Sequence, residues 1–430
     1  MKEYKAISKE LLKFIEDSPS CYHAVDNIKR MFQEAGFEEL EEKDSWNLKK
    51  GGKFFVIRND SSIIAFFIPE KRVSKGFHII AAHSDSPSFK VKENPEMAAE
   101  GNAVKLNVEK YGGMIMSTWF DRPLSVAGRI AVLDEAKKRI VTRLVNVDQD
   151  LLVIPNLAIH MNRDVNKGVE YNAQVDMLPL FALAQDGKKP SLAKCLSKAV
   201  QVKEDEILGH DLFLYVREKG RFIGNEGEFI LSPKLDDLQC AFTAAKAFAE
   251  SRPQEYINVC AVFDNEEVGS GTMQGADSTF LSDTLCRICD GLGDSETEYR
   301  KLLADSFLIS ADNAHAIHPN HPEKADTTNR PCLNGGIVIK FNGNQKYTTD
   351  AFSAAVMKNI CKKAGVPYQT FANRSDVAGG STLGNISTSH VSIPSVDIGL
   401  PQLAMHSAVE TAGAKDAEFA LKAFRVFFAE

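Results

Sequence analysis

The chain has 430 residues, eight of which are cysteine, with 44% hydrophobic residues, 25% charged residues and a formal net charge of −7 at pH 7. These values are typical of a globular protein, and the length predicts either two domains or one domain with a large insertion. The chain contains no basic stripe, no apolar window of membrane-spanning length and no signal-peptide core. We therefore exclude nucleic-acid and membrane partners and expect a reduced, cytoplasmic protein.

The first part of the chain alternates between helical and strand-like patterns. Its predicted helices are residues 5–16 and 23–36, and its predicted strands are Lys53–Ile57, Ser62–Ile68 and Gly76–Ala82. Apolar residues recur at helical spacing in the first two segments, whereas the other three are short apolar or alternating runs. The last of these strands leads directly into His83.

A different pattern runs from Asn94 to Ser232. Short β-type runs separated by turns dominate it, and they are Val104–Val108, Ile115–Trp119, Ser125–Leu133, Arg139–Val145 and Phe213–Tyr215. Helical patterns are sparse, which leaves little room for the crossovers of a parallel sheet. We therefore predict that residues 94–232 form an inserted all-β domain, and that residues 1–93 plus 233–430 form a discontinuous α/β domain.

The alternation of strand and helix resumes after Pro233. The predicted helices are Leu235–Glu250, Thr279–Leu292, Ala351–Ala364 and Ala414–Phe428, and the predicted strands are Ile257–Phe263, Phe307–Ser310, Gly336–Phe341 and Ser392–Ile398. Several apolar strands end abruptly in His, Asp or Glu. This pattern is typical of an α/β sheet that presents its chemistry at the carboxyl ends of its strands.

Two short motifs supply candidate metal ligands. In His83-Ser84-Asp85 the imidazole can ligate a metal while Asp85 orients the ring. Asp236 and Asp237 begin a predicted helix, where one of them can bridge two metals. Each motif also has a structural interpretation, since His83 and Asp85 can be ordinary loop residues, and carboxylates at a helix N-terminus complement the helix dipole.

Glu266 and Glu267 are adjacent carboxylates that follow a buried strand. Their charges repel each other, and local folding offers no reason for the pair. A dinuclear metal site offers one, because one Glu can ligate while the other acts as general base on a bridging water. The alternative is an exposed acidic turn. Asp312 after another strand and His406 in a late loop complete a set of imidazole and carboxylate ligands without thiolate, which suits two hydrolytic metals better than a structural zinc.

The chain resembles peptidase family M18, the aspartyl aminopeptidases, and is similar to the bacterial members. The matching stretches run in family order through nearly the whole chain. They are AAHSDSPSFKVK (81–92), STWFDRPLSVAGRI (117–130), PNLAIHMNRDVN (155–166), SPKLDDLQCAF (232–242), VFDNEEVGS (262–270), SADNAHAIHPN (310–320), IVIKFNGNQKY (337–347) and PQLAMHSAVE (401–410).

The resemblance implies a zinc-aminopeptidase-like α/β/α sandwich with an inserted all-β dimerisation domain. It implies two divalent metal ions per subunit, most simply Zn²⁺, although Co²⁺ or Mn²⁺ would fit the same ligands. Its residue assignments are His83 and Asp312 on one metal, Glu267 and His406 on the other, Asp236 as the bridge, Asp85 orienting His83 and Glu266 as general base. The family commonly has Asn where Asp237 stands, so this chain adds a negative charge beside the ligands.

The resemblance also implies roles that the local pattern does not indicate. His160 would reach a neighbouring subunit's active site and stabilise the developing oxyanion, in dimers assembled into a tetrahedral dodecamer. Lys340 would line the pocket for the first side chain of the peptide substrate and favour Asp or Glu. A polar loop would bind the substrate's amino end and backbone through Asp376, Gly380, Ser381 and Thr382.

Two other functions use the same features. A dinuclear deacylase acting on N-acyl amino acids has similar ligands, and it differs in not requiring a free α-amine. A non-catalytic assembly protein could use metals only to hold its oligomer together. The pair Glu266 and Glu267 argues against the second alternative, because a structural metal site needs no base beside its ligands.

Overall fold

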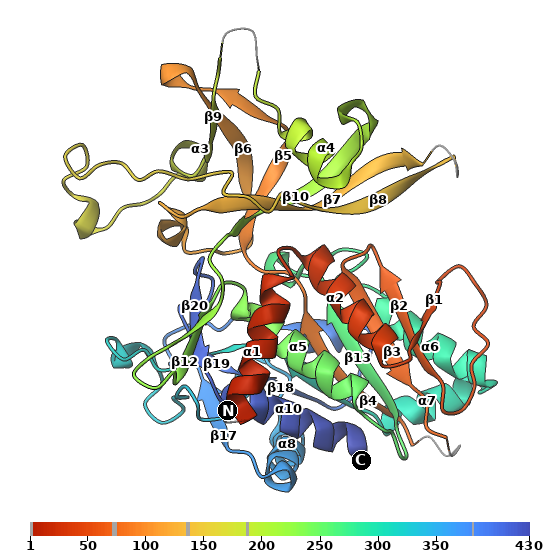
Figure 1. Ribbon diagram of the computed structural model, residues 1–430. Helices are drawn as coiled ribbons and strands as arrows, with labels where there is room; N and C mark the ends of the chain where they lie inside the picture. Colours follow the sequence, from red (N-terminus) through yellow and green to blue (C-terminus); the bar gives the residue numbers. More distant parts are fainter. Residues whose placement is uncertain (1–2, 71–74, 135–137, 186–188, 381) are drawn as a thin grey trace. The chain divides into compact units, whose positions relative to one another are not determined.

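The computed structural model describes residues 3–70, 75–134, 138–185, 189–380 and 382–430. The chain divides into two compact units (Figure 1). The first unit consists of Met1–Asp85, Gly220–Met405 and Glu410–Glu430, and the second consists of Ser86–Lys219 and His406–Val409.

The two units divide the chain after Asp85 and before Gly220, whereas the predicted boundaries lie at residues 93/94 and 232/233. Strand β5 (Ser88–Ala98) runs unbroken through the first predicted junction and pairs with β6 (Ala103–Tyr111) of the second unit. At the other junction, β12 (Phe229–Ser232) pairs with β20 (Glu410–Gly413) of the first unit. The ladder partners of both strands therefore decide where the insertion begins and ends.

Within the described residues, the first unit contains a nine-stranded sheet in the order β1-β2-β3-β13-β4-β14-β18-β16-β17. Its strands are β1 (Glu38–Leu40), β2 (Lys53–Arg58), β3 (Ser62–Phe67), β4 (Phe77–His83), β13 (Ile257–Phe263), β14 (Phe307–Ala311), β16 (Ile337–Phe341), β17 (Tyr368–Ala372) and β18 (Ser395–Gly399). The central strands β13, β4, β14 and β18 are parallel, so their carboxyl ends meet at one edge.

Helices cover both faces of this sheet, as the alternating side chains of β4 show. Ile80 and Ala82 pack into an apolar cluster with α1 (Glu3–Glu16), α2 (Cys21–Glu34), α5 (Leu235–Ala249), α8 (Ala351–Ala364) and α10 (Asp416–Ala429). Phe77, Ile79 and Ala81 pack into a second cluster with α6 (Phe280–Leu292), α7 (Glu296–Ala304) and α9 (Leu383–Ser387). A strand that is buried on both faces is expected to be mostly apolar, and in β4 the only polar residues are His78 and the terminal His83.

Two smaller sheets complete the described chain. The first unit holds a five-stranded sheet in the order β11-β12-β20-β19-β15, which adds β11 (Arg221–Ile223), β15 (Ala314–His315) and β19 (Pro401–Leu403). The second unit holds a six-stranded antiparallel sheet in the order β8-β7-β10-β5-β6-β9, which adds β7 (Leu124–Asp134), β8 (Arg139–Asn146), β9 (Leu180–Leu183) and β10 (Ile207–Val216). Short helices α3 (Ala173–Asp176) and α4 (Leu192–Val200) accompany this sheet.

The predicted strand Ile115–Trp119 is wrong, because Met116–Trp119 forms a 3₁₀ turn. The backbone N–H and the hydroxyl of Thr118 both donate to the carbonyl of Ile115, at 3.1 and 2.7 Å, so a local turn takes up the acceptor that a strand would offer to a neighbour. Among the helices of the described chain, none combines the length and the apolar character needed to cross a bilayer. No disulfide joins the cysteines of these residues.

Candidate metal centre

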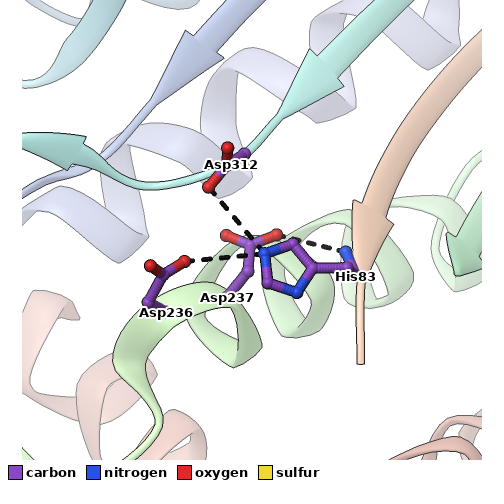
Figure 2. A group of neighbouring side chains, drawn as sticks. All are labelled: His83, Asp236, Asp237 and Asp312. Carbon is purple, nitrogen blue, oxygen red and sulfur yellow. Dashed lines mark hydrogen bonds and ion pairs between the residues drawn. The ribbon is translucent and has the colours of Figure 1, made fainter. Parts of the chain in front are cut away.

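The ionisable residues at the strand ends meet at one edge of the nine-stranded sheet. His83 is the last residue of β4, Asp312 follows β14, and Glu266 and Glu267 follow β13 within a 3₁₀ turn. Because β13, β4 and β14 are parallel neighbours, their side chains come together at this edge. Asp236 and the adjoining Asp237 enter from the start of α5 (Figure 2).

His83 lies at the middle of this group (Figure 2). Its Nδ1 lies 3.1 Å from the backbone oxygen of Asp85 and 3.2 Å from the Asp85 carboxylate. Its Nε2 lies 3.6 Å from Asp236 Oδ1 and 3.9 Å from Asp312 Oδ1. Hydrogen bonding at Nδ1 thus directs Nε2 to the carboxylates, which is the usual arrangement for a metal-binding histidine. Burial lowers the pKa of His83, but the neighbouring carboxylates of Asp236, Asp312 and Asp85 raise it well above its ordinary value.

The Asp237 carboxylate contacts two of the chain segments that carry candidate ligands. Its carboxylate accepts the backbone N–H groups of His83 and Asn313, each at 3.2 Å, and the side chain is fully buried. Burial raises the pKa of Asp237 well above its ordinary value, with a further contribution from the Asp312 and Asp236 charges, while His83 opposes the shift. From the sequence, Asp237 was a candidate bridging ligand, a carboxylate at a helix N-terminus, and a departure from the family pattern. Its contacts with backbone groups far along the chain could not be predicted.

The Asp85 carboxylate also holds the Glu266–Glu267 turn. It accepts the backbone N–H of Glu266 and that of Glu267, each at 3.2 Å. Asn265 before the turn and Gly269 after it adopt left-handed backbone conformations, with φ of 64° and 94°. Asp85 is predicted to orient His83. The same carboxylate also fixes the backbone position of both glutamates. Burial raises the pKa of Glu266 to about 8, and the charges of Asp312, Asp85 and Asp236 add to the effect.

The donor set fits divalent cations. Ligand atoms of His83, Asp236, Asp237 and Asp312 lie within 4.8 Å of one another, and so do those of His83, Glu266 and Glu267. Imidazole and carboxylate are the ligands that hydrolytic zinc sites use. Burial raises the pKa of Glu267 well above its ordinary value, and the charge of Asp236 adds to the effect. A divalent cation would offset this repulsion.

The other predicted ligand, His406, belongs to the second unit. Its Nδ1 donates to the carbonyl of Gly113 at 2.7 Å, and its own carbonyl accepts the N–H of Ile115 at 2.9 Å. The first contact assigns the proton to Nδ1 in the neutral ring, which is the tautomer that ligates a metal through Nε2.

Lys340, predicted to contact substrate, is a buried cation at the end of β16. Its ammonium lies 3.4 Å from Asp312 Oδ2 and 5.5 Å from the centre of the Tyr347 ring. Burial works against the charged form, but Asp312, with Tyr347 and Asp397, outweighs it and holds the pKa of Lys340 above its ordinary value. Lys340 is therefore already paired with a candidate metal ligand.

The remaining predicted site residues are His160 and the members of the polar loop, and they differ in exposure. His160 lies in an exposed loop of the second unit. Asp376 is exposed, and its carboxylate accepts hydrogen bonds from Nε and Nη2 of Arg374, at 2.9 and 2.8 Å. Thr382 is buried and donates to Asp397 at 2.7 Å, whereas Gly380 is exposed. Ser381 lies outside the described residues.

A family model described as aminopeptidase I zinc metalloprotease (M18) matches residues 14–428. The chain belongs to the M18 aminopeptidase family. It is 48% identical, over 431 residues and the full length of both chains, to a probable M18 family aminopeptidase 2 of Clostridium novyi. The M18 fold is shared with the solved complex of Ape4 and Nbr1, at 38% identity and a TM-score of 0.95, with 99% of this chain and 86% of that chain covered.

A second solved structure, the mApe1 dodecamer of S. cerevisiae, is 27% identical with a TM-score of 0.86, covering 99% of this chain and 97% of that one. The predicted family, the α/β fold and the enzyme class are thus confirmed. This M18 aminopeptidase is a metal-dependent hydrolase of the zinc metalloprotease type.

The stability that zinc adds to the M18 aminopeptidase is expected to grow as the pH rises from about 6.5 to about 8. The pKa of Glu266 is raised to about 8, so in this range the metal-free folded protein keeps a proton that the unfolded chain has released. Each such group lowers the free energy of unfolding by up to about 1.4 kcal/mol per pH unit. Urea unfolding with EDTA and with zinc at several pH values measures the difference.

Subtracting the free energy of unfolding of the metal-free protein from that of the zinc-bound protein leaves only the contribution of the metal centre. Asp416, whose pKa burial raises to about 7, accepts the backbone N–H groups of Asn334 and Gly336, which are not candidate ligands, so it is expected to titrate alike with and without zinc. A zinc increment that stays constant between pH 6.5 and 8 would contradict a raised carboxylate pKa at the centre.

Proposed function

We propose that this M18 aminopeptidase binds two divalent cations per subunit, most simply zinc, and removes the first residue of peptides with a free N-terminus. His83 and Asp312 would hold one cation, Glu267 and His406 the other, and Asp236 would bridge them. The observation that carries the proposal is the convergence of ligand atoms around His83 within 4.8 Å. The tautomer of His406 supports its part in the set.

Glu266 is proposed as the general base. The bound cations would lower the pKa of water and polarise the scissile carbonyl. Glu266 takes the proton from the water and passes it to the leaving amine. One feature supports this role: the Asp85 carboxylate accepts the backbone N–H of Glu266 at 3.2 Å and so fixes the position from which its side chain extends.

The enzyme is proposed to act as a homo-oligomer, with dimers assembled into a tetrahedral dodecamer. The yeast relative mApe1 is a dodecamer. The loop that carries His160 also exposes Leu157, Ile159 and Met161, by 55, 52 and 70%. An exposed apolar loop of this kind is typical of a surface that another subunit covers. His160 would then act in a neighbouring active site.

A preference for acidic first residues is proposed through Lys340, which is 3% exposed and close to the candidate ligands. A substrate carboxylate would share the ammonium with Asp312, so the selectivity is expected to be moderate. The loop that contains Asp376, Gly380, Ser381 and Thr382 remains a predicted contact for the substrate backbone.

Cleavage of Asp-, Glu-, Leu- and N-acetyl-Asp peptides, with chelator and with zinc restored, tests the proposal. We expect zinc-dependent release of the first residue from every peptide with a free amine and none from the acetylated peptide. Cleavage of the acetyl group instead would favour the deacylase. Lack of any metal-dependent cleavage would favour the assembly protein.

Replacing Lys340 with leucine is expected to reverse a preference for Asp over Leu, because the pocket then offers the substrate carboxylate no cation. The ratio of kcat/KM for the two peptides measures the effect. The matched control is Lys358→Leu, since this partly exposed lysine of α8 lies 5.9 Å from the Tyr368 ring and has no part in the proposed site. An unchanged ratio in the Lys340 variant would remove the basis for acidic preference.

A further inference from the structure

A buried polar network lies directly behind the candidate ligands, and none of its central residues is itself a ligand. It contains Asn313, Gln402 and Glu410, whose side chains are at most 2% exposed. All three come from the five-stranded sheet of the first unit or its edge: Asn313 precedes β15, Gln402 lies in β19 and Glu410 begins β20.

Continuous hydrogen bonds join the three residues. The Asn313 side-chain amide donates to Gln402 Oε1 at 2.8 Å, and the Gln402 amide donates to Glu410 Oε1 at 3.4 Å. The other oxygen of the Glu410 carboxylate accepts the backbone N–H of Asp236 at 3.0 Å. Separating two of these buried polar groups would break a hydrogen bond and lower the stability of the folded protein. Each group therefore fixes the position of the next.

The other end of the network reaches the start of α5 and the segment that follows β14. The Asn313 side chain donates to the carbonyl of Leu235 at 2.9 Å, and its backbone N–H donates to Asp237 at 3.2 Å. Asn313 also directly follows Asp312 in the chain. Asn313 therefore fastens the segment that carries Asp312 to the segment that carries Asp236.

We propose that Asn313, Gln402 and Glu410 are positioning residues that hold Asp236 and Asp312 at the spacing that zinc binding requires. The inference rests on the proposed ligand set and extends it, because it gives the five-stranded sheet a role in metal affinity. Outer residues that orient metal ligands commonly change metal affinity by about 10- to 100-fold when they are replaced.

Zinc affinity of the metal-free, full-length enzyme, measured by competition with a chromophoric chelator, tests the proposal. We expect Asn313→Ala and Gln402→Met to weaken zinc binding by about 10- to 100-fold. The matched control is Asn258→Ala. Asn258 is equally buried, at 1% exposed, and its amide donates to Ser251 Oγ at 3.3 Å and to the carbonyl of Phe428 at 2.7 Å.

Asn258→Ala and Asn313→Ala are expected to lower the urea midpoint of the metal-free protein to a similar extent, while only the second weakens zinc binding. Gln402→Met nearly preserves side-chain volume, so its zinc affinity tests the positioning role if Asn313→Ala does not fold. Wild-type zinc affinity in Gln402→Met, or an equal loss of affinity in Asn258→Ala, would overturn the proposal.

Asp236→Ala, measured in the same titration, separates this inference from the proposed ligand set. If Asp236→Ala binds zinc as the wild type does, the ligand set is wrong and the positioning role is wrong with it. If Asp236→Ala loses zinc but Gln402→Met keeps it, the ligand set stands and only the positioning role is wrong.

Discussion

Replacement of Glu266 with glutamine is expected to lower kcat by about 10²- to 10⁴-fold while zinc content and KM stay close to wild type. Glutamine has nearly the same shape, and the Asp85 carboxylate would still hold its backbone N–H, which lies 3.2 Å away in the wild type. The amide cannot take up a proton, so only the base is removed. Steady-state kinetics and metal analysis of the same preparation give both quantities.

Glu267→Gln is the matched comparison, since the two residues are adjacent and their backbones are held by the same carboxylate. We expect this variant to lose zinc affinity first and activity as a result, with added zinc restoring part of the rate. If Glu266→Gln keeps a near-wild-type kcat, or if it is Glu266→Gln that loses zinc, the roles assigned to the two glutamates are wrong.

His160→Ala is expected to lower kcat by about 10²- to 10³-fold, the usual effect of removing one donor from an oxyanion hole. The proposed position of His160 in a neighbouring active site allows a sharper experiment. Co-expression of His160→Ala and Glu266→Gln chains with different tags, followed by isolation of mixed oligomers, is expected to restore activity. With equal amounts and random pairing in dimers, about one quarter of the sites would be complete.

Complementation distinguishes action between subunits from action within one. If His160 acted in its own subunit, every active site of a mixed oligomer would lack one of the two groups, and activity would stay at the level of the single variants. Oligomers that contain only one variant serve as the control. A fully active wild-type monomer in light scattering would also contradict the proposed exchange of His160.

The ends of the central strands could be predicted from the sequence, because their physical cause is local. Burial on both faces of the sheet makes β4, β13 and β14 mostly apolar. His83 ends β4, Asp312 follows β14, and the acidic residues Asp264, Glu266 and Glu267 follow β13. The parallel pairing of neighbouring strands then brings these residues to one edge.

The features that could not be predicted depend on partners far away in the sequence. The hydrogen bond from Asn313 to Gln402 joins residues 89 apart and the one from Asp236 to Glu410 joins residues 174 apart, and neither leaves a periodic pattern in the chain. The extent of the two units likewise depends on distant strand pairing, since β12 pairs with β20 of the first unit. The role of Asp237 as an acceptor for two backbone N–H groups likewise required the assembled sheet.

The order of strands in the nine-stranded sheet has a consequence for how the enzyme acquires its metal during synthesis. Within the described residues, β4 pairs with β13 and β14, which are translated much later, and Glu410, whose carboxylate holds Asp236, is translated 174 residues after it. At ordinary translation speeds, His83 waits tens of seconds for these neighbours. We therefore expect the proposed ligand set to stay incomplete in a nascent chain until these later segments have been made, so that zinc binding follows the folding of the sheet rather than guiding it.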